Sequence, residues 1–167
     1  MQWFTFLSTL LGAAIGVSST LISERFRGRE TRLQLERAMR TETYLNFLQA
    51  MNESAGALRT LALKAAETSP DQRQEASRKA LSDSCLYVMR ERVILFAPNS
   101  VAVAMNVVFN SLLEMQEVVA GGCDRRSPEF LDCLSAYADS VQTLRTEMRT
   151  DVGGEPLRND IEWAPRD

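Results

Sequence analysis

The sequence predicts an all-α protein in which a single N-terminal transmembrane helix precedes an antiparallel four-helix bundle. Three observations lead to this fold class. The first 23 residues carry no charged side chain. Beyond them, apolar residues recur at alternating spacings of four and three, which is the period of one helix face. Prolines and glycine pairs divide this pattern into segments, and no stretch has the period-2 alternation of a strand.

Charge is distributed unevenly along the 167 residues, although the net charge is only −3. Residues 24–40 hold six arginines and three glutamates, whereas residues 41–167 hold 13 basic and 19 acidic groups. A basic collar therefore joins an uncharged end to an acidic body. An acidic body does not favour nucleic-acid binding.

The uncharged end has the length of a membrane span. Residues 3–22 would form a helix of about 30 Å, the thickness of the hydrocarbon core of a bilayer. We therefore predict a transmembrane anchor at 1–23, followed by a basic juxtamembrane stalk at 24–43. Two alternatives are a cleaved secretory signal, which would need positive residues before the apolar stretch, and a buried core helix of a soluble bundle.

The collar predicts orientation. No Lys or Arg precedes the apolar stretch, whereas four arginines follow it closely, and positive residues favour the cytoplasmic side. We therefore expect a single-pass protein of the cell inner membrane, with the N-terminus outside and the body in the cytoplasm. The same side chains can meet anionic lipid headgroups. They are Arg25, Arg27, Arg29 and Arg32.

Small residues recur every four positions within the predicted anchor, at Ser8, Gly12, Gly16 and Thr20. In lipid, such a face lets two helix backbones approach closely. The pattern favours self-association or pairing with another membrane helix. The alternative is a smooth face with no partner.

The bundle is predicted at 44–154. Its first helix runs to about Glu67. Ser69, Pro70 and Gln72 have the pattern of a capping box that starts the second helix. That helix should continue to about Ala97.

Pro98 then stops the second helix, and Asn99 or Ser100 caps the third. Gly121-Gly122 ends the third helix, and Ser127-Pro128 starts the fourth, which Gly153-Gly154 ends. A long coiled coil is the alternative, but it would not be interrupted so often. The apolar spines of the last two helices are Val101, Met105, Val108, Leu112, Met115 and Val119, and Phe130, Leu134, Tyr137, Val141, Leu144 and Met148.

The remaining residues, 155–167, form a predicted flexible C-terminal tail without helical period. Ile161 and Trp163 are its strong apolar anchors. They either dock on the chain's own bundle or contact a partner.

Residues suited to catalysis are scarce. The chain has no histidine, which removes the usual general base and the commonest metal ligand. Cys85, Cys123 and Cys133 lack zinc-site spacing, and the last two either pair or stay reduced. We expect no enzymatic activity, no cofactor and no metal. Carboxylates are expected to be solvated. The core is expected to include Tyr44, Tyr137, Met39, Met51, Met105, Met115 and Met148.

These features favour a membrane-anchored interaction or regulatory module that works through lipid and a protein partner. The layout resembles that of many small bacterial proteins with one anchor and a helical body. Two alternatives place the body outside the membrane. One is a ligand-sensing helical bundle, and the other is an envelope-acting factor related to lysis or phage proteins.

Overall fold

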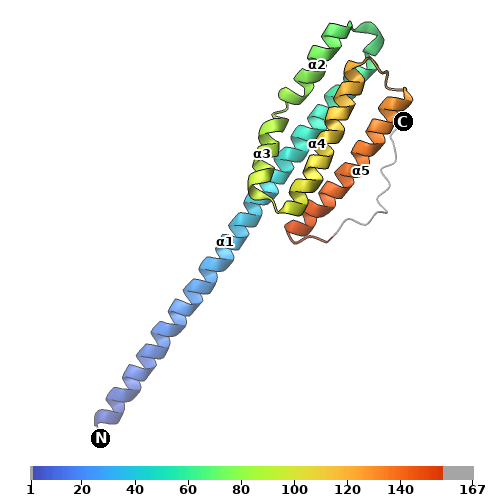
Figure 1. The fold of residues 1–167 in the computed structure, drawn as a ribbon. Coiled ribbons are helices and arrows are strands. Elements are labelled where there is room, and N and C mark those ends of the chain that lie inside the picture. The colour runs from blue at the N-terminus through green and yellow to red at the C-terminus, as the bar shows by residue number, and fades with distance from the viewer. Residues whose placement is uncertain (1, 156–167) are drawn as a thin grey trace. The chain divides into compact units, whose positions relative to one another are not determined.

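A computed structural model of the chain describes the backbone of residues 2–155 and the side chains of residues 31–155 (Figure 1). Over this range the protein is all-α, as predicted, with four helices of which one is bent, and without a strand. The elements are α1 (Gln2–Leu63), η1 (Ala65–Glu67), α2 (Pro70–Ser82), α3 (Leu86–Phe96), α4 (Asn99–Ala120) and α5 (Pro128–Asp151).

The chain divides into two compact units, residues 1–39 and residues 40–167. In the first unit, the described side chains at 31–39 are all exposed, including Met39, which we had expected in the core. Within the part of the chain whose side chains are described, no helix combines the length and apolar character needed to cross a membrane. The predicted anchor at 1–23 lies outside that part.

The second unit is the bundle. Its helices run alternately up and down, and the bent second helix consists of α2 and α3 (Figure 1). α5 packs along α4, and α2 and α3 also contact α4. All six predicted spine positions of α4 are fully buried, and five of the six on α5 are buried, whereas Leu134 is partly buried. The apolar faces therefore pack as their spacing predicts.

Local signals place most helix starts. The Ser69 hydroxyl accepts from the Gln72 amide at 3.4 Å, and the Gln72 side chain accepts from the Ser69 amide at 3.3 Å, which confirms the capping box. The Ser127 hydroxyl caps α5 with a single bond, accepting from the amide of Phe130 at 3.2 Å. The predicted cap at Asn99 or Ser100 is wrong by a residue, because Pro98 occupies the cap and its carbonyl accepts from the Ala102 amide.

The second helix differs from its prediction because it breaks between Ser82 and Leu86 instead of continuing to Ala97. Cys85 adopts a left-handed conformation with φ 56°, which a helix cannot continue through. Beside the break, the Ser84 hydroxyl lies 2.7 Å from the buried Ser54 hydroxyl of α1. This polar contact between helices accompanies a bend that no proline or glycine marks.

Candidate protein-docking face

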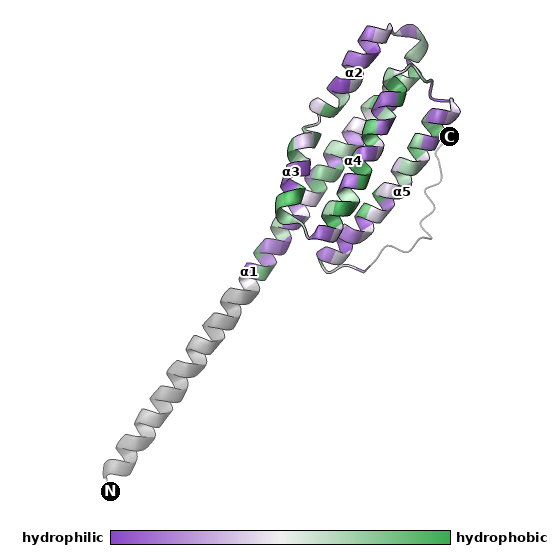
Figure 2. Ribbon diagram, in the orientation of Figure 1, coloured by the Kyte–Doolittle hydropathy of each residue, from purple (hydrophilic) through white to green (hydrophobic). Residues whose placement is uncertain are grey.

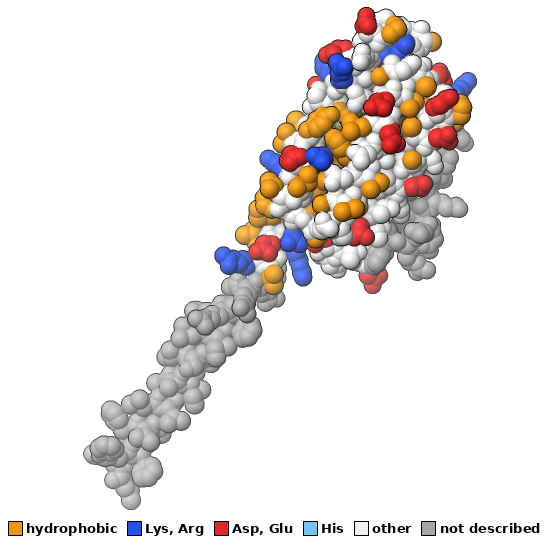
Figure 3. All heavy atoms as spheres, in the orientation of Figure 1, with side chains coloured by type: hydrophobic (Ala, Val, Ile, Leu, Met, Phe, Trp, Pro, Cys, Tyr) orange, Lys and Arg blue, Asp and Glu red, His pale blue; other side chains and the backbone are white. Residues whose placement is uncertain are grey.

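Hydrophobic side chains gather on one face of the bundle, over α3 and α4 (Figure 3). The ribbon coloured by hydropathy shows hydrophobic residues along both helices (Figure 2). We call this apolar face the docking face. Leu95 is its most exposed member at 76%, and the other five members are 40–56% exposed. Clustered apolar exposure of this kind marks interaction sites, whereas isolated exposed residues are ordinary. Its members are Tyr87, Val88, Ile94 and Leu95 of α3 and Val103 and Val107 of α4.

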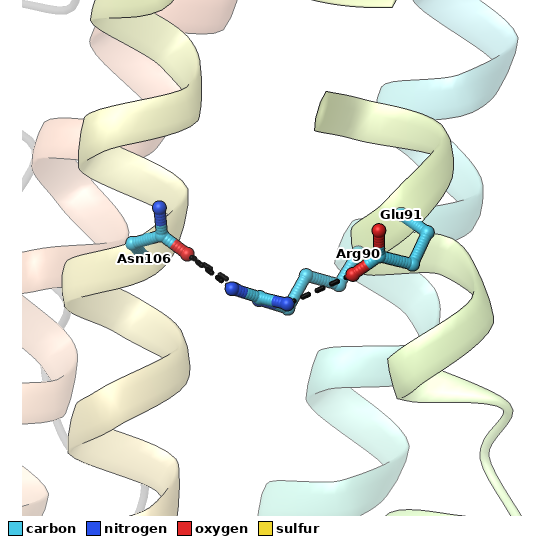
Figure 4. A network of polar contacts seen from close by, with 3 residues as sticks. All are labelled: Arg90, Glu91 and Asn106. Atoms are coloured by element: carbon cyan, nitrogen blue, oxygen red, sulfur yellow. Dashed lines mark hydrogen bonds and ion pairs between the residues drawn. The ribbon is translucent and has the colours of Figure 1, made fainter. Parts of the chain in front are cut away.

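Arg90 of α3 joins the two helices that carry this face (Figure 4). Its Nη2 and Nε atoms donate to the Asn106 side-chain oxygen on α4, at 3.0 and 3.3 Å. Its Nη1 atom donates to Glu91 at 2.8 Å. Because Arg90 is itself half-buried, these bonds fix the spacing between α3 and α4.

An aromatic pair continues the junction. The Arg90 guanidinium lies 5.0 Å from the ring centroid of Phe109, and Phe109 meets Tyr87 edge-to-face with centroids 5.5 Å apart. Both geometries are attractive. Tyr87 is half-exposed while its ring packs against Phe109, so it presents a preorganised aromatic surface. Tyrosine and arginine are the residue types over-represented among binding hot spots.

A polar clamp lies at the end of the bundle where the chain enters it. The Asp151 carboxylate of α5 accepts from the Tyr44 hydroxyl at 2.6 Å and from Arg40 at 3.0 Å. Burial, followed by the bond to Asp151, raises the pKa of Tyr44 well above its ordinary value. The clamp therefore ties α1 to the last turn of α5.

The described side chains include no group of three or more Cys, Asp or Glu residues arranged to hold a metal ion. Glu114, Glu117, Asp132 and Asp139 are exposed, as expected of solvated carboxylates. All three cysteines are free, so Cys123 and Cys133 are not joined in this structure. Burial, and next the carboxylate of Glu114, raise the pKa of the Cys133 thiol, so it is a poor nucleophile.

Most of the sequence-predicted site residues lie outside the described side chains. This applies to the pairing face of Ser8, Gly12, Gly16 and Thr20, to Arg25, Arg27 and Arg29, and to Ile161 and Trp163 in the tail. Arg32 is described, and it is exposed on α1.

Sequence reasoning missed the docking face. A signal was present in the apolar run from Val93 to Ala97, which is too continuous for one buried helix face. Only Val93 of that run is fully buried in the structure.

Comparisons with protein-family models, curated proteins and solved structures found no match to this chain.

Proposed function

We propose that the chain is a membrane-anchored helical-bundle module without catalytic activity, which binds and regulates a protein partner through the docking face. The observation that carries this proposal is the exposed apolar surface of α3 and α4, together with the Arg90 junction between these two helices. The partner it fits is an apolar stripe on another protein, such as one face of an amphipathic helix.

Burial of the apolar side chains of the docking face by a partner should favour binding. Full burial of an exposed Leu, Ile or Val side chain is worth about 1.5–3 kcal/mol. Leu95 and Val103 therefore contribute about 1–2 kcal/mol each when a partner covers the part now exposed. The bonds of Arg90 to Asn106 and its contact with Phe109 restrict α3 relative to α4, which lowers the ordering cost of binding.

Location comes from the sequence. The uncharged segment 1–23 anchors the protein, and the arginine collar favours a cytoplasmic body and contact with anionic lipid. Protease added to intact cells should leave the body uncut. Cleavage from outside would refute this orientation and support the sensor or envelope-factor alternatives.

The partner is tested by quantitative affinity purification from native membranes. Leu95→Asp and Val103→Asp should each lower recovery of a stoichiometric partner by about tenfold or more, since each places a charge in an apolar contact. Leu45→Asp is the matched control, because Leu45 is an exposed leucine of α1 outside the docking face. Equal loss in all three variants, or no stoichiometric partner, would refute the proposal.

Self-association is a separate part of the proposal. Gly12→Leu combined with Gly16→Leu should abolish pairing through the anchor, because leucine side chains keep two backbones apart. An unchanged oligomeric state in membranes would exclude pairing through this face.

A further inference from the structure

The exposed side of α4 continues beyond the docking face. Val103, Val107, Asn110, Glu114 and Glu117 are spaced 4, 3, 4 and 3 apart, so they lie along one side of the helix. All five side chains are exposed. From Val103 to Glu117 this stripe covers fourteen residues, or about 21 Å. It is apolar where it belongs to the docking face and acidic at its other end.

α5 adds a third carboxylate beside the acidic end of the stripe. α5 packs along α4, and Asp132 is exposed near the start of α5. Burial raises the pKa of the Cys133 thiol, and the carboxylates of Glu114 and Asp132 raise it further, so both carboxylates lie near this thiol. We call Glu114, Glu117 and Asp132 the acidic extension of the docking face.

The acidic extension has no ion-pair partner within residues 31–155. Neither α4 nor residues 128–144 of α5 contain a Lys or Arg. On α2, Arg73 donates to two backbone carbonyl groups, and Lys79 pairs with Asp83. Figure 3 shows acidic side chains over α4 and α5 on the same face of the molecule as the hydrophobic ones. The negative charge is therefore available to a binding partner.

An apolar surface that runs into an acidic one discriminates between partners by charge. Complementary charges across an interface favour encounter and fix the register of the partner, whereas like charges oppose binding. An amphipathic helix with lysines or arginines next to its apolar stripe has the matching arrangement. About four turns of such a helix would reach from Val103 to Glu117.

We propose that the partner of the docking face is a basic amphipathic helix, whose apolar side chains cover the docking face and whose lysines or arginines lie over the acidic extension. This inference rests on the proposed function of the docking face. It adds the charge of the partner and the length of the segment that binds.

The probes are two synthetic peptides of about four helical turns with the same leucine stripe. One carries lysines at both ends of the stripe, and the other carries glutamates at the same positions. Binding of each labelled peptide to the full chain in phosphatidylcholine nanodiscs is measured by fluorescence anisotropy, with protein-free nanodiscs as the blank. We expect the lysine peptide to bind about tenfold more tightly than the glutamate peptide at low salt, and the difference to shrink as salt rises.

Charge variants test the acidic extension directly. Glu114→Gln combined with Glu117→Gln should lower affinity for the lysine peptide by about fivefold. Glu114→Lys combined with Glu117→Lys should reverse the preference in favour of the glutamate peptide. The matched control is Glu42→Gln combined with Glu53→Gln, two exposed glutamates of α1, and it should change neither affinity. The proposal is overturned if the wild type binds both peptides equally or binds neither, or if the control weakens binding as much as the first pair.

Leu95→Asp separates this inference from the proposed function. It should weaken binding of both peptides, and no effect on either would refute the docking face itself. If Leu95→Asp weakens both peptides but the wild type does not distinguish them, the docking face stands and the charge of the partner is wrong. Dimerisation in detergent micelles that Leu95→Asp abolishes would assign the face to a second copy of the chain and overturn the proposal.

Discussion

A double-mutant cycle can measure how much the hydrogen bond between Tyr44 and Asp151 contributes to the stability of the bundle. The Tyr44 hydroxyl is buried and donates to a carboxylate whose side chain is only 10% exposed, at 2.6 Å. Arg40 is the second partner of this carboxylate, and its side chain is 36% exposed. The cycle compares Tyr44→Phe, Asp151→Ala and the double variant.

The magnitudes follow from these exposures. A hydrogen bond to a charged group contributes about 1.5–3 kcal/mol, which is the expected cost of Tyr44→Phe. Asp151→Ala loses the same bond and also the partly exposed ion pair with Arg40, worth about 0.2–1 kcal/mol, so it should cost about 2–4 kcal/mol. The double variant loses the hydrogen bond only once. The coupling energy should therefore be about 1.5–3 kcal/mol.

The assay is urea unfolding of the full chain in detergent micelles, followed by helical circular dichroism. Each kcal/mol should also lower the melting temperature by about 2–4 °C for a chain of this size. A coupling energy below about 0.5 kcal/mol would show that the clamp does not stabilise the bundle and would refute the reasoning. Leu45→Ala, at an exposed neighbouring position, controls for local effects on α1.

Three further predictions concern single positions in the same assay. Tyr137→Phe should stabilise the bundle by about 1 kcal/mol, because the buried Tyr137 hydroxyl has no hydrogen-bond partner among the described residues. Burial raises the pKa of Tyr137 to about 12 from an ordinary 10.0, so above pH 10 the unfolded state loses its proton first. Between pH 10 and 12 this group should lower the free energy of unfolding of the wild type by about 1.4 kcal/mol per pH unit, and Tyr137→Phe should lack this decrease. Equal pH slopes of the two proteins would contradict the prediction. Cys85→Gly should stabilise by about 0.5–1 kcal/mol, since glycine removes the left-handed strain but adds unfolded-state entropy; a lower urea midpoint would argue against it. Leu112→Ala should lower the free energy of unfolding by about 2–5 kcal/mol, because it opens a cavity in the core. Val107 is half-exposed, so the control Val107→Ala should change it by about 0.5 kcal/mol or less. Similar losses in the two variants would contradict the assignment of Leu112 to the core.

The predictable parts of the fold are those encoded by neighbouring residues. Ser69, Ser127 and the glycine pairs act through bonds to residues within five positions, so the helix starts and ends can be predicted from local sequence. The spine of α4 is predictable because its apolar spacing has only one helical interpretation.

The bend and the docking face depend on distant residues instead. The contact of Ser84 with Ser54 joins residues thirty apart, and the local sequence around Cys85 does not predict this contact. Likewise, Arg90 bonds to Asn106, sixteen residues away on α4, and the apolar run at Val93 does not indicate which side of α3 faces outward. Which residues of an apolar run stay exposed is set by packing against α4, not by their hydropathy.

The bend at Cys85 divides local stability unequally within the bundle. α4 and α5 have 22 and 24 residues, whereas α2 and α3 have 13 and 11, which is short for a helix to persist without its neighbours. We therefore expect amide hydrogen exchange to be fastest in α2 and α3 and slowest in α4 and α5. The docking face thus lies partly on the segment that opens most readily, so a bound partner would slow exchange most in α3.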